Sequence, residues 1–175
     1  MTSTHRWPAA LSALLALALT GCAPPAAPDP EPAFATEAEA FAAAEKTYRA
    51  YVDALNEVDL SDPETFEAVY AWTTGDANAE ARETFSRMHA DNWNVSGTST
   101  VTAVELEDVS DRMVRLAVCL DVSKVLLLDH SRQSAVSEDR PDIQSMLITL
   151  QASKSRGSDL LISDFAGREG EPKCA

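Results

Sequence analysis

The sequence predicts a single α+β domain in which N-terminal helices pack on a curved antiparallel sheet. Up to about residue 89, apolar side chains recur at spacings of three and four, which is typical of amphipathic helices. From Trp93 onward, apolar and polar residues alternate and β-branched types dominate, which indicates strands. The chain has 175 residues, which is enough for one domain with a substantial core behind an N-terminal leader.

Residues 1–21 have the pattern of an export signal. His5 and Arg6 form a weakly basic start, and residues 7–20 form an apolar run without charge. This run of roughly 14 residues suits the core of a signal peptide and is shorter than the ~20 residues that a membrane-spanning helix needs.

The stretch LTGC at residues 19–22 resembles the lipobox of bacterial lipoproteins. The resemblance implies a diacylglyceryl group on the Cys22 thiol and cleavage before Cys22. Two acyl chains anchor a protein stably, so the expected location is the extracytoplasmic face of the cell membrane, with lipid on Cys22 as the link. The alternative is a plain secretory signal that is cleaved among Ala23, Ala26 and Ala27.

A proline-rich spacer follows the lipobox. Residues 23–35 hold five of the nine prolines in the chain, so this stretch is expected to form a semi-rigid spacer without helix or sheet. The predicted organisation is therefore a signal peptide at 1–21, a lipidated cysteine and linker at 22–35, and a folded domain at 36–175.

The charge of the chain limits its partners. Asp and Glu number 28 and Lys and Arg number 14, which gives a formal net charge of −14. Nucleic-acid binding depends on basic residues that neutralise phosphates, so no nucleic acid is expected as a partner. Docking onto anionic headgroups is also disfavoured, so the membrane link should be covalent. An acidic surface keeps an exported protein soluble, and attraction of a cationic partner is the alternative explanation.

Two cysteines remain beyond Cys22, and they are expected to pair. An exported protein lies in an oxidising compartment, where a Cys119–Cys174 disulfide would tie the C-terminal tail to the domain. Closing this loop is worth roughly 4 kcal/mol on the chain-entropy model. The alternatives are two free thiols or a metal site, although two cysteines without a nearby histidine pair make a poor zinc site.

Three helices are predicted in the first half of the domain. The first spans 36–57, where Thr36 and Glu39 form a capping box. Its apolar face consists of Phe41, Ala44, Tyr48, Tyr51, Val52 and Leu55. The second helix starts at Asp62-Pro63 and ends before Gly75, and the third spans about 77–89.

The second half predicts antiparallel strands. In the clearest strand, 113–122, one face carries Val114, Leu116, Val118, Leu120 and Val122 and is expected to be core. Cys119 lies on the other face, within reach of a returning tail. The remaining predicted segments are a strand region at 93–106 bent at Gly97, a turn at 107–111, an extended stretch at 124–129, a polar loop at 130–141, and strands at 143–152 and 159–165.

This order of elements resembles the NTF2-like, cone-shaped fold, the group that includes ketosteroid isomerase and SnoaL-like cyclases. The resemblance covers about residues 37–175 and rests on the element order, on WNVSGTSTV at 93–101, on VCLDVS at 118–123 and on GREGEPKC at 167–174. The chain looks most similar to small actinobacterial lipoproteins of that group. The fold hosts both enzymes and binding modules, so the resemblance does not select a function.

Candidate chemistry is sparse. An NTF2-like catalytic pocket needs an acid or base inside the cone with a hydrogen-bond donor opposite. Asp164 alternates in phase with Leu160 and Ile162 and is predicted to point inward, with Tyr48 or Tyr51 as the donor. The sequence shows no phosphate-binding glycine loop, no metal-ligand spacing and no nucleophile elbow, so no cofactor and no metal are expected.

The leading functional hypothesis is a non-catalytic module that binds a small apolar ligand or an envelope protein partner. The alternative is an isomerase- or cyclase-type enzyme that acts on a small hydrophobic substrate through Asp164. A third interpretation is an assembly factor for a larger envelope complex, which would present an exposed apolar patch.

Overall fold

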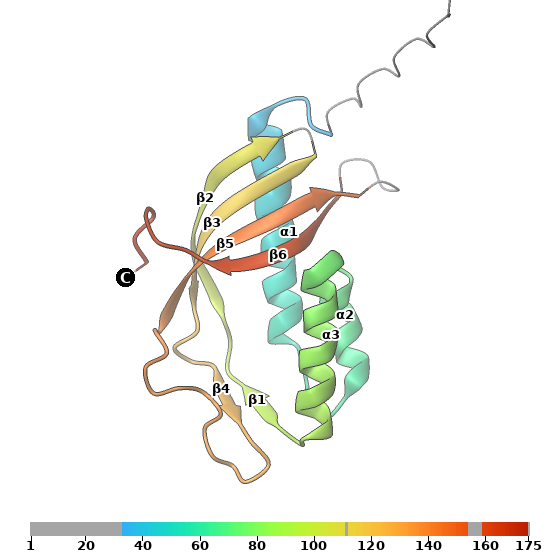
Figure 1. Cartoon of the computed structure of the whole chain (residues 1–175), viewed down its shortest axis with the longest axis vertical. Helices are drawn as coiled ribbons and strands as arrows, with labels where there is room; N and C mark the ends of the chain where they lie inside the picture. Colours follow the sequence, from blue (N-terminus) through green and yellow to red (C-terminus); the bar gives the residue numbers. More distant parts are fainter. Residues whose placement is uncertain (1–32, 111, 154–158, 175) are drawn as a thin grey trace, which may run out of the picture. The chain divides into compact units, whose positions relative to one another are not determined.

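The computed structural model describes residues 33–110, 112–153 and 159–174. The chain divides into two units, residues 1–30 and residues 31–175, and all described residues belong to the second unit. In that unit, helices lie against one face of a curved antiparallel sheet (Figure 1). The predicted signal peptide, Cys22 and the linker up to residue 32 lie outside the described residues.

The first helix begins at the predicted cap. The Thr36 hydroxyl accepts a hydrogen bond from the Glu39 amide at 3.1 Å, and a Glu39 carboxylate oxygen accepts one from the Ala35 amide at 3.2 Å. The helical elements are α1 (Glu37–Asn56), the 3-10 helix η1 (Pro63–Thr65), α2 (Phe66–Tyr70) and α3 (Gly75–Ala90).

The connection from α2 to α3 differs from the prediction. Gly75 was expected to follow the end of the second helix, but it is the first residue of α3 and has φ of +55°. This left-handed conformation favours glycine and lets the chain change direction directly into the next helix. The prediction that the third helix starts near residue 77 was therefore late by two residues.

The main sheet has four antiparallel strands in the order β2-β3-β5-β6. Its strands are β2 (Thr100–Ser110), β3 (Met113–Asp121), β5 (Ile143–Ala152) and β6 (Leu160–Gly167). The turn predicted at 107–111 was wrong, because β2 continues to Ser110 and pairs with β3 along its length. A bulge between Leu106 and Asp108 interrupts the alternation there, and Asp108 accepts a hydrogen bond from Arg115 of β3 at 3.3 Å.

A separate two-stranded ribbon lies at the lower end of Figure 1 and consists of β1 (Asn94–Ser96) and β4 (Leu126–Leu128). Gly97, where a bend was predicted, separates β1 from β2 and has φ of +85°. A Cβ atom at this position would overlap the carbonyl oxygen of Lys124. The chain therefore needs glycine both for its backbone angle and for the close approach of the 124–125 segment.

The core lies between α1 and the sheet. The predicted inner face of β3 is buried throughout, and it packs with Ala44, Tyr48 and Val52 of α1. Ile148, Leu150, Leu160 and Ile162 of β5 and β6 complete this cluster. The helix-on-curved-sheet layout is the one that the NTF2-like resemblance implies, and the α+β fold class is confirmed.

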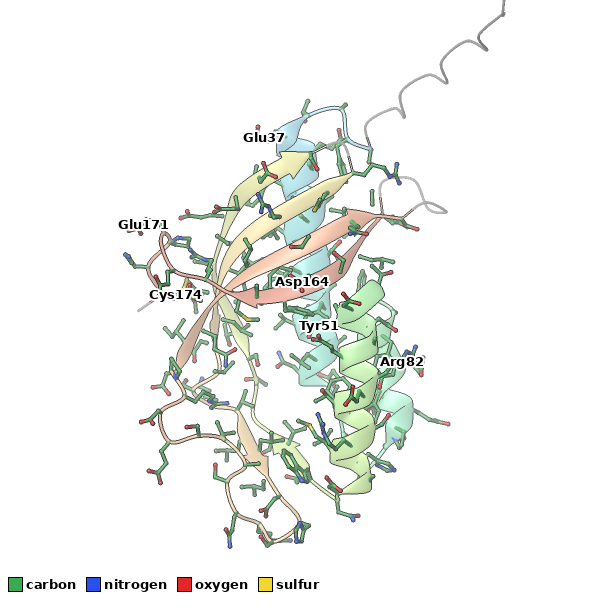
Figure 2. The ribbon with its side chains drawn as sticks, in the orientation of Figure 1. Glu37, Tyr51, Arg82, Asp164, Glu171 and Cys174 are labelled. Atoms are coloured by element: carbon green, nitrogen blue, oxygen red, sulfur yellow. A yellow bond between two sulfur atoms is a disulfide. The ribbon has the colours of Figure 1, made fainter. Side chains whose placement is uncertain are left out.

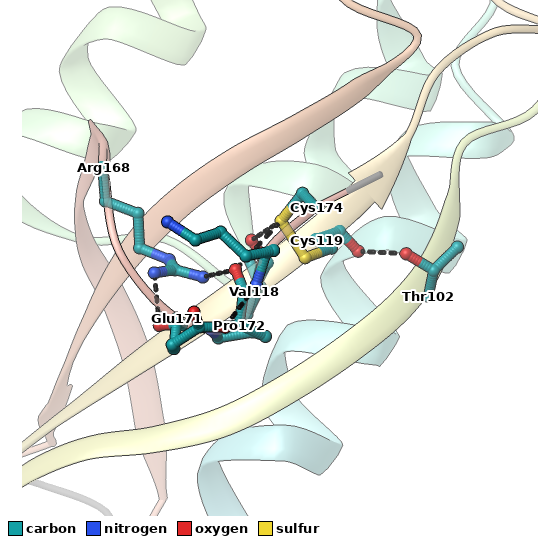
Figure 3. Close-up of a disulfide and its surroundings, with 8 residues drawn as sticks. Thr102, Val118, Cys119, Arg168, Glu171, Pro172 and Cys174 are labelled. Carbon is teal, nitrogen blue, oxygen red and sulfur yellow. Dashed lines mark hydrogen bonds between the residues drawn. A yellow bond between two sulfur atoms is a disulfide. The ribbon is translucent and has the colours of Figure 1, made fainter.

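The C-terminal tail crosses the face of the sheet opposite the helices (Figure 3). A disulfide joins Cys119 to Cys174 with 5.4 Å between their Cα atoms, within the usual range, so the predicted pairing is confirmed. Arg168 stabilises the tail by donating to the carbonyl oxygens of Glu171 and Pro172, the latter at 2.7 Å. Cys119 is only 2% exposed although it lies on the outer face of β3, because the tail covers it.

Candidate functional site

An apolar pocket of about 220 Å³ lies between the end of α1, α3 and the β1–β4 ribbon. Figure 1 shows the lower ends of α1 and α3 converging toward this ribbon. The pocket is lined by Leu55, Asn56, Val58, Leu60, Phe85, Met88, Val95, Ser96, Gly97, Ser99, Val125, Leu127, Val136 and Arg140. Most of this wall is aliphatic or aromatic, which is the usual make-up of small-molecule sites.

A second hydrophobic cluster supports one wall of the pocket. Leu60, Phe66 and Tyr70 are buried there, and Phe85 and Met88 of α3 pack against them. The rings of Phe66 and Phe85 have their centroids 5.2 Å apart, a favourable spacing for an aromatic pair. This wall is thus a packed continuation of the protein interior.

Asn56 ties the end of α1 to the chain between β1 and β2. Its Nδ2 donates to the Ser99 carbonyl at 3.0 Å, and its Oδ1 accepts from the Ser99 amide at 2.8 Å. These two hydrogen bonds have the donor-and-acceptor pattern of a backbone pair between antiparallel strands, and they hold Ser99 against the end of α1 in the pocket wall. Because each end of the amide bonds to Ser99, Asn56 positions this part of the pocket wall.

Arg140 is the charged residue of the pocket wall. Its Nη2 donates to the carbonyl oxygens of Val122 at 2.9 Å and Val125 at 3.0 Å, which holds the guanidinium against the turn between β3 and β4. No carboxylate is among the residues that line the pocket. The pocket therefore combines an apolar interior with one fixed positive charge.

Tyr48 and Tyr51 lie in the core and do not line the pocket. Their ring centroids are 6.2 Å apart, and the Tyr51 ring lies 5.2 Å from that of Phe165. Burial raises the pKa of Tyr51 to about 12. The pKa of Tyr48 is raised more strongly, first by burial and second by the charge that Tyr51 would carry when ionised. These phenols pack as part of the interior and stay neutral at physiological pH.

The prediction that Asp164 points into the cone was wrong. The register of β5 and β6 shifts between Thr149, which pairs with Asp164, and Leu150, which pairs with Ile162. Ser163 is the extra residue in β6, so the alternation changes phase after Ile162. Phe165 consequently packs on the core, and the Asp164 carboxylate is exposed (Figure 2).

Neither a metal site nor a membrane-spanning helix is found in the part of the chain that the structure describes. No group of three or more His, Cys, Asp or Glu side chains there is placed to hold a metal ion. Within the same residues, none of the helices is both long and apolar enough to cross a bilayer.

Comparison with known proteins shows the fold and no closer relationship. No family model matches the chain, and no curated protein matches its sequence. The intermembrane-space region of the chloroplast protein ARC6 superimposes with a TM-score of 0.53 at 13% identity, over 74% of this chain and 97% of that one. At this identity the likeness concerns the fold alone.

Two further solved structures have lower similarity. One is a structure from Catenulispora acidiphila in complex with S-DNPA, with a TM-score of 0.48, 14% identity, and coverage of 74% of this chain and 92% of that one. The other is CagV, a VirB8 homolog of T4SS from Helicobacter pylori, with a TM-score of 0.45, 10% identity, and coverage of 71% and 95%.

Proposed function

We propose that this chain is a lipid-anchored binding module of the cell envelope that holds a small, mainly apolar ligand in the pocket between α1, α3 and the β1–β4 ribbon. The anchor would be the diacylglyceryl group on Cys22, and the spacer up to residue 35 would hold the domain away from the membrane. The composition of the pocket supports the binding role, and the lipobox resemblance supports the location.

The observation that carries the binding role is a pocket that is apolar and free of carboxylates in its wall. General acid–base chemistry needs a titrating group within hydrogen-bond reach of the substrate. The enzyme alternative depended on an inward Asp164 beside Tyr48 or Tyr51, and Asp164 is exposed. A binding role needs only the shape and apolar character that are present.

The exposed apolar side chains favour a small ligand over a broad docking face. Among the described residues, the large apolar side chains with substantial exposure are Met113 at 39% and Leu126 at 57%. They belong to different sheets, the four-stranded sheet and the ribbon. An extended apolar patch, which an assembly factor would present, is thus not found in this part of the chain.

The binding role is tested by titrating the protein with toluene and indole while following side-chain methyl resonances by NMR. We expect shifts confined to the pocket wall, at Met88, Val95 and Leu127, because an apolar cavity of about 150 Å³ already holds benzene. Met88→Trp narrows the cavity and should abolish these shifts. Ser86→Trp on the exposed side of the same helix is the control and should leave them unchanged. Absence of any pocket shift with either compound would contradict the proposal.

The anchor is tested by the intact mass of the full-length protein extracted from its own membrane and denatured under non-reducing conditions. We expect a chain that starts at Cys22, is heavier by a diacylglyceryl group and is lighter by the two hydrogens lost in the disulfide. A chain that starts beyond Cys22 would refute the lipid anchor and leave the pocket untouched.

A further inference from the structure

We infer that the ligand is a small amphipathic monocarboxylate, a short-chain or single-ring acid, whose apolar body fills the pocket and whose carboxylate binds the guanidinium of Arg140. This inference deepens the proposed function and rests on it, because it assigns the polar end of a ligand in the same pocket.

The guanidinium of Arg140 is held in place before any ligand arrives. Its Nη2 bridges the carbonyl oxygens of Val122 and Val125, and Val125 is itself part of the pocket wall. The side chain therefore loses little conformational freedom when a ligand binds, which favours affinity.

The charge of Arg140 has no counter-ion among the described residues. No carboxylate there lies within ion-pair distance of it, and its nearest acidic neighbours in sequence, Glu138, Asp139 and Asp142, are exposed. Its Nε and Nη1 also donate to no described residue. Arg140 is half-buried and lines the pocket, so its guanidinium is available to an anion bound there, and its planar shape matches a carboxylate in particular.

The pocket sets the size of the apolar part. Its volume of about 220 Å³ exceeds the ~150 Å³ that holds benzene and lies below the ~300 Å³ at which sites for drug-sized ligands begin. A single ring or a short alkyl chain fits this space.

The single cation of the pocket wall favours a ligand with one negative charge. The formal charge of −14 opposes the approach of anions. At physiological ionic strength, charges more than about 8 Å away are largely screened, so the contact with Arg140 decides the binding of a monoanion. A dianion or a phosphate would carry a second charge for which the pocket wall has no partner.

The inference is tested by calorimetric titration of the protein with hexanoate and with hexanamide, which has the same shape and no charge. We expect hexanoate to bind at least about tenfold more tightly, the usual gain from a charge-assisted hydrogen bond. Arg140→Gln should lose the preference, so that hexanoate binds no more tightly than hexanamide, because its carboxylate is desolvated without a cationic partner. Arg140→Lys should keep part of the preference. Lys124→Gln and Arg132→Gln, which remove exposed charges flanking the ribbon, should keep all of it.

The outcomes separate this inference from the proposed function. Equal binding of hexanoate and hexanamide to the wild-type pocket would overturn the carboxylate assignment and leave the binding role intact. Binding of neither compound, with no pocket shifts from toluene or indole, would overturn both. A preference that survives Arg140→Gln would overturn the assignment to Arg140, and its loss in Lys124→Gln would then assign the anion contact to Lys124. If Arg140→Gln does not fold, the wild-type comparison and Arg140→Lys decide the result.

Discussion

At the scale of single residues, the two core tyrosines make the stability of the fold depend on alkaline pH. Burial raises the pKa of Tyr51 from 10.0 to about 12 and raises that of Tyr48 as well. The folded state therefore holds these protons more tightly than the unfolded chain does. The contribution of the two neutral phenols to the free energy of unfolding is therefore fully present below pH 10 and is lost as the pH rises from 10 through 12.

This dependence is checked with the double variant Tyr48→Phe/Tyr51→Phe. Phenylalanine keeps the ring packing with Phe165 and removes the ionisable hydroxyls. We expect wild type to lose free energy of unfolding between pH 8 and pH 11, measured by urea denaturation, and the double variant to lose clearly less. Equal losses in the two proteins would show that other groups, such as Tyr70, control the alkaline transition.

At the scale of elements, the junction between β1 and β2 depends on Gly97. Gly97→Ala places a Cβ atom on the Lys124 carbonyl and requires a residue other than glycine at φ of +85°. We expect a loss of about 2–4 kcal/mol in the free energy of unfolding, together with weaker ligand binding, because the ribbon must move.

Gly75→Ala is the matched control for this effect. Gly75 also has positive φ, at +55°, but no atom lies within 4 Å of a Cβ built there. Its substitution should cost only about 1 kcal/mol in urea denaturation, the backbone penalty alone. If Gly75→Ala and Gly97→Ala lost similar free energies of unfolding, the close approach of Lys124 to Gly97 would contribute nothing to the loss at Gly97.

The disulfide attaches the C-terminal tail to β3. Cys119→Ala/Cys174→Ala frees a loop with a sequence separation of 55 residues and should lower the free energy of unfolding by up to about 4 kcal/mol. Toluene binding should persist, because none of the residues that line the pocket belongs to the tail. A loss below about 1 kcal/mol would contradict a stabilising role for the bridge.

At the scale of the whole molecule, local sequence patterns predicted the helix and sheet layers of the fold, and they did not predict the pocket between α1, α3 and the β1–β4 ribbon. Periodicity located α1 and the buried face of β3, because each depends on spacing along one segment. The bridge was predicted differently, from the two cysteines that remain in a chain expected to be exported. Asp164 was misplaced because a bulge at Ser163 changes the phase of β6, and simple alternation carries no mark of it.

The pocket residues were missed for a different reason. Asn56 and Arg140 gain their roles from partners 43, 18 and 15 residues away, at Ser99, Val122 and Val125. In the sequence, Arg140 lies in a polar loop that is indistinguishable from a solvated one. Only the packing of the ribbon against α1 and α3 brings these groups to one cavity.

The most direct test of the binding role is a native mass spectrum of the full-length protein extracted gently from its own membrane. We expect a non-covalent mass that leaves on activation, is small enough for a pocket of about 220 Å³, and is retained by Ser86→Trp and absent from Met88→Trp. A protein that carries no such mass, or a mass that Met88→Trp retains, would contradict the assignment of this pocket as the ligand site.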